Sequence, residues 1–148
     1  MSLYCPAIEP TASSVQGEVS PNLSALKGKK ILVVDDDDLN LKFVGIMSRN
    51  WGMHLIYASD GKMALQILQK NPVDVILTDF QMNEMDGIEL MKAVQSQCHL
   101  KHIPVIMMSS WTFSNNEIKE LEKSGFRFIL PKPLAPAVVQ EKLNCILK

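Results

Sequence analysis

Residues 31–38 read Ile-Leu-Val-Val-Asp-Asp-Asp-Asp, four apolar residues followed directly by four aspartates. A short, continuous apolar run is typical of a strand that is buried on both faces. Carboxylates a few ångströms apart resist ionising together, so a positive charge is expected near this block. A divalent cation such as Mg²⁺ takes oxygen ligands of this kind. A solvated acidic loop or a helix N-terminus would also favour aspartate, and both interpretations stay open for this stretch taken alone.

The composition is that of an ordinary globular domain. The 148 residues are 47% hydrophobic and 21% charged, which is enough to bury a core. A formal net charge of -1 gives no general attraction to nucleic acid or to an anionic membrane, so neither is an expected partner. No apolar run approaches the ~20 residues of a spanning helix and no secretory signal opens the chain, so a cytoplasmic location is expected. Cys5, Cys98 and Cys145 show no zinc or disulfide spacing.

The chain divides into two regions of different composition. Residues 1–28 contain several prolines, serines and threonines and show no apolar periodicity. This pattern predicts a flexible tail or interdomain linker over residues 1–28, followed by one folded domain over residues 29–148.

Within the predicted domain, apolar runs alternate with amphipathic segments. The runs predicted to form strands are residues 31–34, 53–58, 73–77, 105–108 and 126–130. Between these runs, apolar residues at helical spacing predict five helices. The residues are, helix by helix, Leu39, Phe43, Ile46 and Met47; Ala64, Leu65 and Leu68; Ile88, Met91 and Val94; Ser114 to Leu121; and Val139, Leu143 and Ile146. Gly52 is the predicted C-terminal cap of the first helix. Five strand–helix repeats predict a three-layer, doubly wound α/β domain with a parallel sheet.

Ligands of such sheets bind beyond the carboxyl ends of the strands. The polar residues at the ends of the runs are Asp35 and Asp36, Asp79, Ser109 and Ser110, and Lys132. Each of them alone has an ordinary explanation as a cap or a solvated charge, but together they predict a site at one edge of the sheet. Carboxylates that hold a metal ion, a fixed ammonium and a hydroxyl suit a phosphoryl group on one carboxylate, because phosphoryl transfer needs positioning and charge neutralisation.

The chain resembles the receiver domains of two-component response regulators. The resemblance rests on residues 30–36, 74–82, 85–87, 104–110 and 132–133, which occur in the family's order and spacing. It implies a flavodoxin-like (β/α)5 fold with strand order 2-1-3-4-5. It also implies a phosphoacceptor that takes a phosphoryl group from a phosphohistidine and acts in signalling, without being an enzyme on other substrates.

The family's site residues carry over position by position. Asp79 matches the phosphorylated aspartate, Lys132 the ion-pairing lysine and Ser109 the hydroxyl that faces the phosphoryl group. The implied ligands of Mg²⁺ or Mn²⁺ are Asp35, Asp36, Asp79 and the backbone carbonyl of Gln81. The Lys132–Pro133 peptide is expected to be cis. Asp37 and Asp38 have no matching role and are expected to cap the first helix.

The resemblance also implies partners. These are a histidine kinase or a histidine phosphotransfer domain, with the fourth and fifth helices as a candidate homodimer face. The basic lead-in of residues 25–30 after the linker resembles the junction before the receiver of a hybrid histidine kinase, and a stand-alone receiver is the second interpretation.

Four positions depart from the family pattern. Ile129 stands where a Tyr or Phe is common, so the usual pairing of a hydroxyl with an aromatic ring is not expected. Asn83 replaces a frequent Pro, and Ser110 a common Ala or Gly. Trp111 lies where a side chain of the family can border the path of attacking water. We hypothesise that Trp111 slows hydrolysis of the acyl phosphate, with simple packing on the loop as the alternative.

Three other functions compete with this interpretation. Asp35-x-Asp37 resembles the nucleophile motif of haloacid-dehalogenase-type phosphatases, but the usual Gly-Thr is missing and no second acidic pair ends a later strand. A flavodoxin would bind a phosphate in its first loop, which four carboxylates oppose. A pseudo-receiver would bind partners without phosphorylation, and the presence of Asp79, Asp36 and Lys132 argues against it. His99 and His102 are predicted to be surface residues, and His54, at the start of a predicted strand, is not expected to be catalytic.

Overall fold

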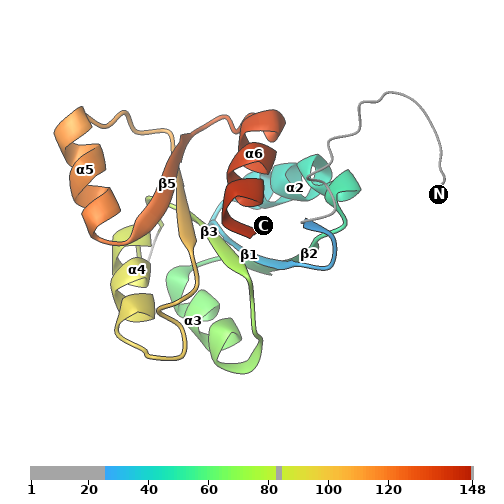
Figure 1. Cartoon of the computed structure of the whole chain (residues 1–148), viewed down its shortest axis with the longest axis horizontal. Helices are drawn as coiled ribbons and strands as arrows, with labels where there is room; N and C mark the ends of the chain where they lie inside the picture. The colour runs from blue at the N-terminus through green and yellow to red at the C-terminus, as the bar shows by residue number, and fades with distance from the viewer. Residues whose placement is uncertain (1–25, 83–84, 148) are drawn as a thin grey trace.

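A computed structural model describes residues 26–82 and 85–147 of the chain. Its five strands form a single parallel sheet in the order β2-β1-β3-β4-β5, as predicted (Figure 1). The strands are β1 (Lys30–Val34), β2 (His54–Ala58), β3 (Val75–Asp79), β4 (Val105–Ser109) and β5 (Phe126–Pro131). The predicted tail lies almost entirely outside the described residues.

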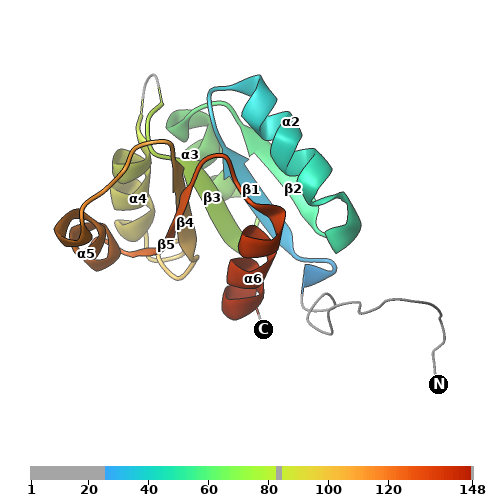
Figure 2. The same ribbon diagram turned by 90° about the horizontal axis from the view of Figure 1, so that it is seen from above.

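Helices connect the strands and cover both faces of the sheet. They are α2 (Asp38–Met47), α3 (Gly61–Lys70), α4 (Gly87–Gln95), α5 (Asn115–Lys123) and α6 (Pro136–Leu147), with a short 3-10 turn η1 (Arg49–Trp51) after α2. Helices α2 and α6 lie on one face, and α3, α4 and α5 lie on the other (Figure 2). The predicted three-layer architecture is therefore confirmed. No described helix is long and apolar enough to cross a bilayer.

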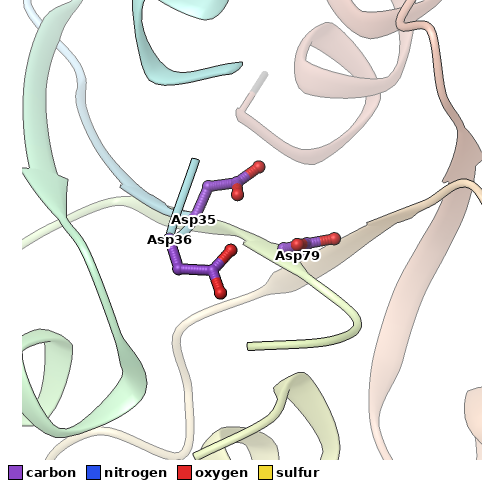
Figure 3. A group of neighbouring side chains, drawn as sticks. All are labelled: Asp35, Asp36 and Asp79. Carbon is purple, nitrogen blue, oxygen red and sulfur yellow. The ribbon is translucent and has the colours of Figure 1, made fainter. Parts of the chain in front are cut away.

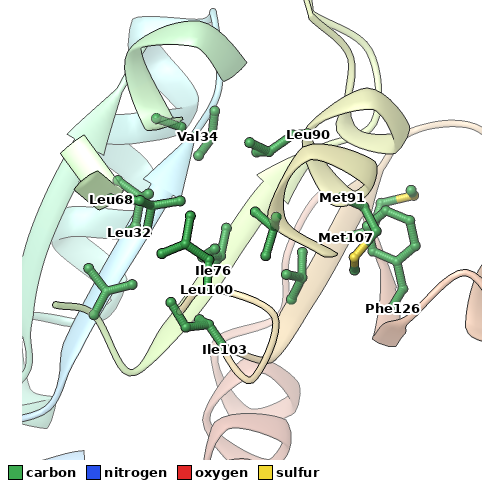
Figure 4. Close-up of a cluster of buried hydrophobic side chains, with 14 of the residues drawn as sticks. Leu32, Val34, Leu68, Ile76, Leu90, Met91, Leu100, Ile103, Met107 and Phe126 are labelled. Atoms are coloured by element: carbon green, nitrogen blue, oxygen red, sulfur yellow. The ribbon is translucent and has the colours of Figure 1, made fainter. Parts of the chain in front are cut away.

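The core consists of two apolar clusters, one on each face of the sheet. The cluster under α3, α4 and α5 includes Leu32, Ile76, Leu90, Met91 and Met107 (Figure 4). The cluster under α2 and α6 is built around Val33, Leu77, Ile106 and Leu143. Strands β3 and β4 are buried along their whole length, which explains their unbroken apolar sequence. Burial of each large side chain contributes roughly 1.5–3 kcal/mol.

The folded domain includes residues before the boundary predicted at Lys29. Leu26 is fully buried in the cluster under α2 and α6. Gly28 takes a positive φ of 79° and its N–H donates to the carbonyl of Gly52 at 2.9 Å, which joins this segment to the turn before β2. A single apolar residue before a glycine has no periodicity, so this contact could not be predicted from the sequence.

Helix α2 does not bury the face that the sequence predicted. Leu39, Phe43 and Ile46 are exposed, whereas Val44 is the buried residue of the helix and Leu41 and Met47 pack beside it. The helix carries apolar residues on more than one side, so periodicity did not identify the inward face. The predicted cap was also displaced, because α2 ends at Met47 and Gly52, in the left-handed conformation, ends η1 instead.

The ends of the helices follow the local chemistry of the sequence. Asp37 is the N-cap of α2, and its side chain accepts a hydrogen bond from the N–H of Leu39, as expected. Ser114 and Glu117 form a capping box at the start of α5. Asp86 and Glu89 form a second capping box at α4. His99 and His102 are exposed, as predicted, and His54 is exposed as well.

Helix α4 begins against the backbone of β3. The N–H of Gly87 donates to the carbonyl of Phe80 at 2.9 Å. A Cβ atom on Gly87 would lie 2.6 Å from the backbone oxygen of Asp79. A glycine is therefore required here, and this close approach fixes the start of α4 next to the end of β3.

Candidate functional site

Three aspartates meet at the carboxyl edge of the sheet. Asp35 and Asp36 directly follow β1, and Asp79 is the last residue of β3. These two strands are neighbours, with Val34 paired to Thr78, so the side chains emerge side by side (Figure 3). One carboxylate oxygen from each aspartate lies within 4.8 Å of the others. Asp35 is fully buried, Asp79 is largely buried and Asp36 is exposed.

Lys132 brings the positive charge that the acidic cluster requires. Its Nζ atom lies 3.1 Å from Oδ2 of Asp35 and 3.0 Å from Oδ1 of Asp79. The backbone N–H of Lys132 donates to the carbonyl of Ser109 at 2.8 Å, which continues the pairing of β4 and β5 to the site. The Lys132–Pro133 peptide is cis, as expected.

Asp79 has a raised pKa. Burial is the largest cause, and the negative charge of Asp35 adds to it, whereas the hydrogen bond and the charge of Lys132 lower the pKa in part. The native state therefore holds this proton more tightly than the unfolded chain does. Ionisation of Asp79 lowers native stability, and this loss appears as the pH rises through the native pKa of the carboxyl group.

Lys132 also has a raised pKa, although burial by itself lowers it. The hydrogen bonds to Asp79 and Asp35, together with the charges of these two carboxylates, outweigh the burial. The stability that this ammonium contributes is present below its unfolded pKa and is lost only as the pH rises through the higher native pKa. Lys132 is therefore a fixed cation at neutral pH.

The two buried carboxylates differ in which of their oxygens are engaged. Oδ1 of Asp35 accepts the N–H of Asp37 at 2.9 Å, and Oδ2 of Asp35 binds Lys132. For Asp79, Oδ1 accepts both Lys132 and the N–H of Phe80, the latter at 2.9 Å. Among the described residues, Oδ2 of Asp79 has no hydrogen-bond donor. Asp79 is therefore the buried carboxylate with an oxygen left for chemistry.

A pocket of about 170 Å³ opens at Asp79. It is lined by Asp79, Phe80, Gln81, Ser109, Ser110, Trp111 and Lys132. Its volume is several times the roughly 30 Å³ that a water molecule occupies in the liquid. Ser109 is buried, and its Oγ atom accepts the N–H of Trp111 at 2.9 Å, so the hydroxyl hydrogen remains available to a ligand.

The structure brings together every residue that the sequence predicted for the site and adds one that the sequence missed. Gln81 and Ser109 line the pocket beside Asp79, and the Trp111 side chain is 59% exposed at its mouth. Phe80 was not predicted, since an apolar residue after a strand carries no chemical signal. Asn83 lies outside the described residues.

The donor set fits a hard divalent cation. Asp35, Asp36 and Asp79 offer only oxygen atoms, and the exposure of Asp36 leaves room for water ligands. Mg²⁺ prefers such partly hydrated sites, with one or two carboxylates and a phosphate. The same geometry places an ammonium, a hydroxyl and a carboxylate around one pocket, which suits charge neutralisation of a phosphoryl group.

Comparison with known proteins identifies the family of this chain. The family model described as "Response regulator receiver domain" matches residues 31–144. Chemotaxis protein CheY-3 of Vibrio cholerae is 34% identical over 123 residues, which cover 82% of this chain and 94% of that protein. The rice two-component response regulator ORR5 is 34% identical over 119 residues, which cover 80% of this chain and 88% of that protein.

Solved structures agree with this assignment. The chemotaxis response regulator CheY4 of Vibrio cholerae superimposes with a TM-score of 0.75 at 32% identity, over 82% of this chain and all of that one. The receiver domain of the Pseudomonas aeruginosa sensor histidine kinase PA1611 shares the fold at 23% identity, with a TM-score of 0.73 over 81% of this chain and 98% of that one, and contains a magnesium ion in its active site cleft. The chain belongs to the response regulator receiver domain family of two-component signalling proteins.

Proposed function

We propose that Asp79 is the residue of this receiver domain that accepts a phosphoryl group from a phosphohistidine. The observation that supports this most directly is that Asp79 lines the pocket and that Lys132 and the N–H of Phe80 both bind its Oδ1 atom, which leaves Oδ2 without a hydrogen-bond donor among the described residues. In the reaction, a carboxylate oxygen attacks phosphorus, the bond between phosphorus and the imidazole nitrogen breaks, and the imidazole leaves with the electron pair of that bond.

We propose that Asp35, Asp36, Asp79 and the backbone carbonyl of Gln81 hold the metal ion, with Mg²⁺ or Mn²⁺ as the occupant. The bound cation would neutralise the phosphoryl oxygens and relieve the repulsion among the three carboxylates. The separation of the donor oxygens, within 4.8 Å, supports this assignment for the aspartates. Gln81 lines the same pocket.

Lys132 and Ser109 complete the proposed machinery. The Lys132 ammonium can turn from Asp79 toward a phosphoryl oxygen and keep its contact with Asp35, so the charge stays in place during transfer. The Ser109 hydroxyl can donate to a phosphoryl oxygen while its own oxygen still accepts the N–H of Trp111. Both groups act by position and charge.

The phosphatase alternative requires Asp35 as the nucleophile. Asp35 is fully buried, and each of its oxygens already accepts a hydrogen bond, one from Asp37 and one from Lys132. An attack by Asp35 would break one of these contacts inside the protein, whereas Asp79 has an oxygen free. The geometry therefore favours Asp79.

We propose that the donor protein docks on the exposed apolar face of α2. Leu39, Phe43 and Ile46 are 72%, 42% and 62% exposed, which is unusual for large apolar side chains on one helix. An apolar pocket of about 150 Å³ lies beside them, lined by Phe43, Val44, Met108 and the loop of Lys132. This surface is continuous with the site, so a protein bound there can present a phosphohistidine to Asp79.

Two broader assignments remain predictions. A homodimer would use the fourth and fifth helices, α5 and α6, and light scattering of the phosphorylated and unphosphorylated protein would test it. A hybrid histidine kinase is the proposed parent, and the sequence of the complete gene would test that.

The first prediction concerns the phosphoacceptor. The wild-type chain, incubated with acetyl phosphate and Mg²⁺, should gain the mass of one phosphoryl group, and Asp79→Asn should gain none, because its amide cannot attack phosphorus. Intact mass spectrometry makes the measurement. Labelling of Asp35 in its place would support the phosphatase alternative, and an unlabelled wild-type protein would support the pseudo-receiver.

The second prediction concerns the metal. Mg²⁺ at about 100 times its dissociation constant should raise the free energy of unfolding by about 2.7 kcal/mol. Asp36→Asn should lose most of this stabilisation, because it removes a proposed ligand. Asp38→Asn is the matched control, since Asp38 lies in the same acidic run but outside the cluster. Equal Mg²⁺-dependent shifts of the thermal unfolding midpoint in both variants would rule the proposed ligand set out.

The third prediction concerns the docking face. Phe43→Ser should slow phosphoryl transfer from a phosphorylated histidine phosphotransfer domain by about tenfold, the loss expected when an interface anchor worth about 1.4 kcal/mol is removed. Its labelling by acetyl phosphate should not change. Val138→Ser, at an exposed apolar residue of α6, is the control. If Phe43→Ser slows phosphorylation by the phosphotransfer domain and by acetyl phosphate equally, the substitution affects the site itself and the docking proposal fails.

The fourth prediction concerns Trp111. We propose that its exposed indole at the mouth of the pocket limits the access of water to the acyl phosphate. Trp111→Ala should shorten the lifetime of phosphorylated protein by roughly threefold to tenfold, which corresponds to about 1 kcal/mol of activation free energy. Thr112→Ala, at the next exposed residue, should leave it unchanged. The decay of the phosphorylated mass after removal of acetyl phosphate gives the lifetime, and equal lifetimes in Trp111→Ala and wild type would show that Trp111 only packs on the loop.

A further inference from the structure

Two aromatic rings meet beside the phosphoacceptor site. Phe80 follows Asp79 in the chain, and Phe113 lies in the loop between β4 and α5. Their ring centroids are 5.1 Å apart and their planes are at 83°, the edge-to-face geometry that aromatic pairs prefer. Both rings are partly buried against the core cluster under α3, α4 and α5.

The Phe80 end of this pair is tied to the site through its backbone. The N–H of Phe80 donates to Oδ1 of Asp79 at 2.9 Å and to the carbonyl of Met108 at 3.0 Å. Its carbonyl accepts the N–H of Gly87 at 2.9 Å. A change in the charge or position of the Asp79 carboxylate therefore acts directly on the residue that carries the ring.

The Phe113 end of the pair is tied to α5. Phe113 directly precedes Ser114, the N-cap of that helix. Leu121 is the one buried residue within α5, so few side chains hold this helix against the sheet. A shift of Phe113 therefore changes a large part of the anchoring of α5.

The two rings of strand β5 do not pair with Phe80 or Phe113, because Phe126 is buried within the same core cluster and Phe128 packs on the opposite face of the sheet. Ile129 is aliphatic and packs on the same cluster as Phe80 and Phe113. The Oγ atom of Ser109 accepts the N–H of Trp111 within the loop. The contact between Phe80 and Phe113 is therefore the aromatic connection, within the described part of the chain, between the end of β3 and the start of α5.

We infer that the Phe80–Phe113 pair couples the state of Asp79 to the position of α5. This inference rests on the proposed phosphorylation of Asp79. Phosphorylation converts one carboxylate oxygen into the bridging oxygen of an acyl phosphate and draws Lys132 toward the new phosphoryl oxygens, so the hydrogen bond from Phe80 to Asp79 changes. The ring of Phe80 moves with its backbone, and Phe113 and the first turn of α5 follow.

The test is hydrogen exchange of the α5 amides in the complete chain, before and after phosphorylation by acetyl phosphate and Mg²⁺. In the wild type, phosphorylation should change exchange in the first turns of α5 by about fivefold, at the lower end of usual allosteric couplings. In Phe113→Leu the change should fall below about twofold, because an aliphatic side chain loses the ring contact. Phe113→Tyr keeps the ring and should retain the response.

Phe128→Leu is the matched control. Phe128 is a phenylalanine of β5 that packs on the opposite face of the sheet, near Lys142. In Phe128→Leu, phosphorylation should change the exchange of the α5 amides as it does in the wild type. The double variant Phe80→Leu/Phe113→Leu should show no greater loss than Phe113→Leu alone, because two members of one contact are not additive.

The outcomes distinguish failure of the coupling from failure of the proposed function. Intact mass, measured on the same samples, reports phosphorylation independently of α5. A labelled Phe113→Leu protein whose α5 responds as in the wild type would overturn the coupling and leave the phosphoacceptor function intact. A clearly greater loss in the double variant than in Phe113→Leu would also overturn the coupling. Absence of the phosphoryl adduct from the wild type would overturn the proposed function and the coupling together.

Discussion

The site of this receiver domain depends on the repulsion among three carboxylates at the end of a buried sheet. Asp35, Asp36 and Asp79 meet there because β1 and β3 are neighbours, and the low polarity of the core strengthens the repulsion. Lys132 compensates two of these charges with contacts of 3.1 and 3.0 Å. Burial raises the pKa of Asp79, and the negative charge of Asp35 adds to this effect. Three carboxylates beside one ammonium form a donor set that suits a hard divalent cation.

The rest of the fold holds these four groups in place. The close approach of Gly87 to the backbone of Asp79 fixes the start of α4, and the N–H of Lys132 bonded to the carbonyl of Ser109 extends the sheet up to the site. The two core clusters keep β3 and β4 buried on both faces. The charged side chains at the ends of these strands are therefore held in fixed positions. Fixed positions suit phosphoryl transfer, because that chemistry needs positioned charges.

Most of the architecture could be predicted from the sequence because buried parallel strands consist of short runs of apolar residues. The order of the strands came from the resemblance to the family, since periodicity identifies strands but not their neighbours. The inward face of α2 was predicted wrongly because Leu39, Phe43 and Ile46 are as apolar as the residues that the helix buries. Apolar residues that are exposed and apolar residues that are buried look the same in a sequence.

The sequence by itself determined the fold class and the chemical identity of the site, because the carboxylates, the hydroxyl and the lysine all follow apolar runs whose carboxyl ends must meet at one edge of a parallel sheet. Only the tertiary structure decided which oxygen of each aspartate is engaged, that the face of α2 beside the site is exposed, and that Phe80 meets Phe113. These features depend on side chains from distant segments that touch in space, and no local pattern in the chain records such contacts.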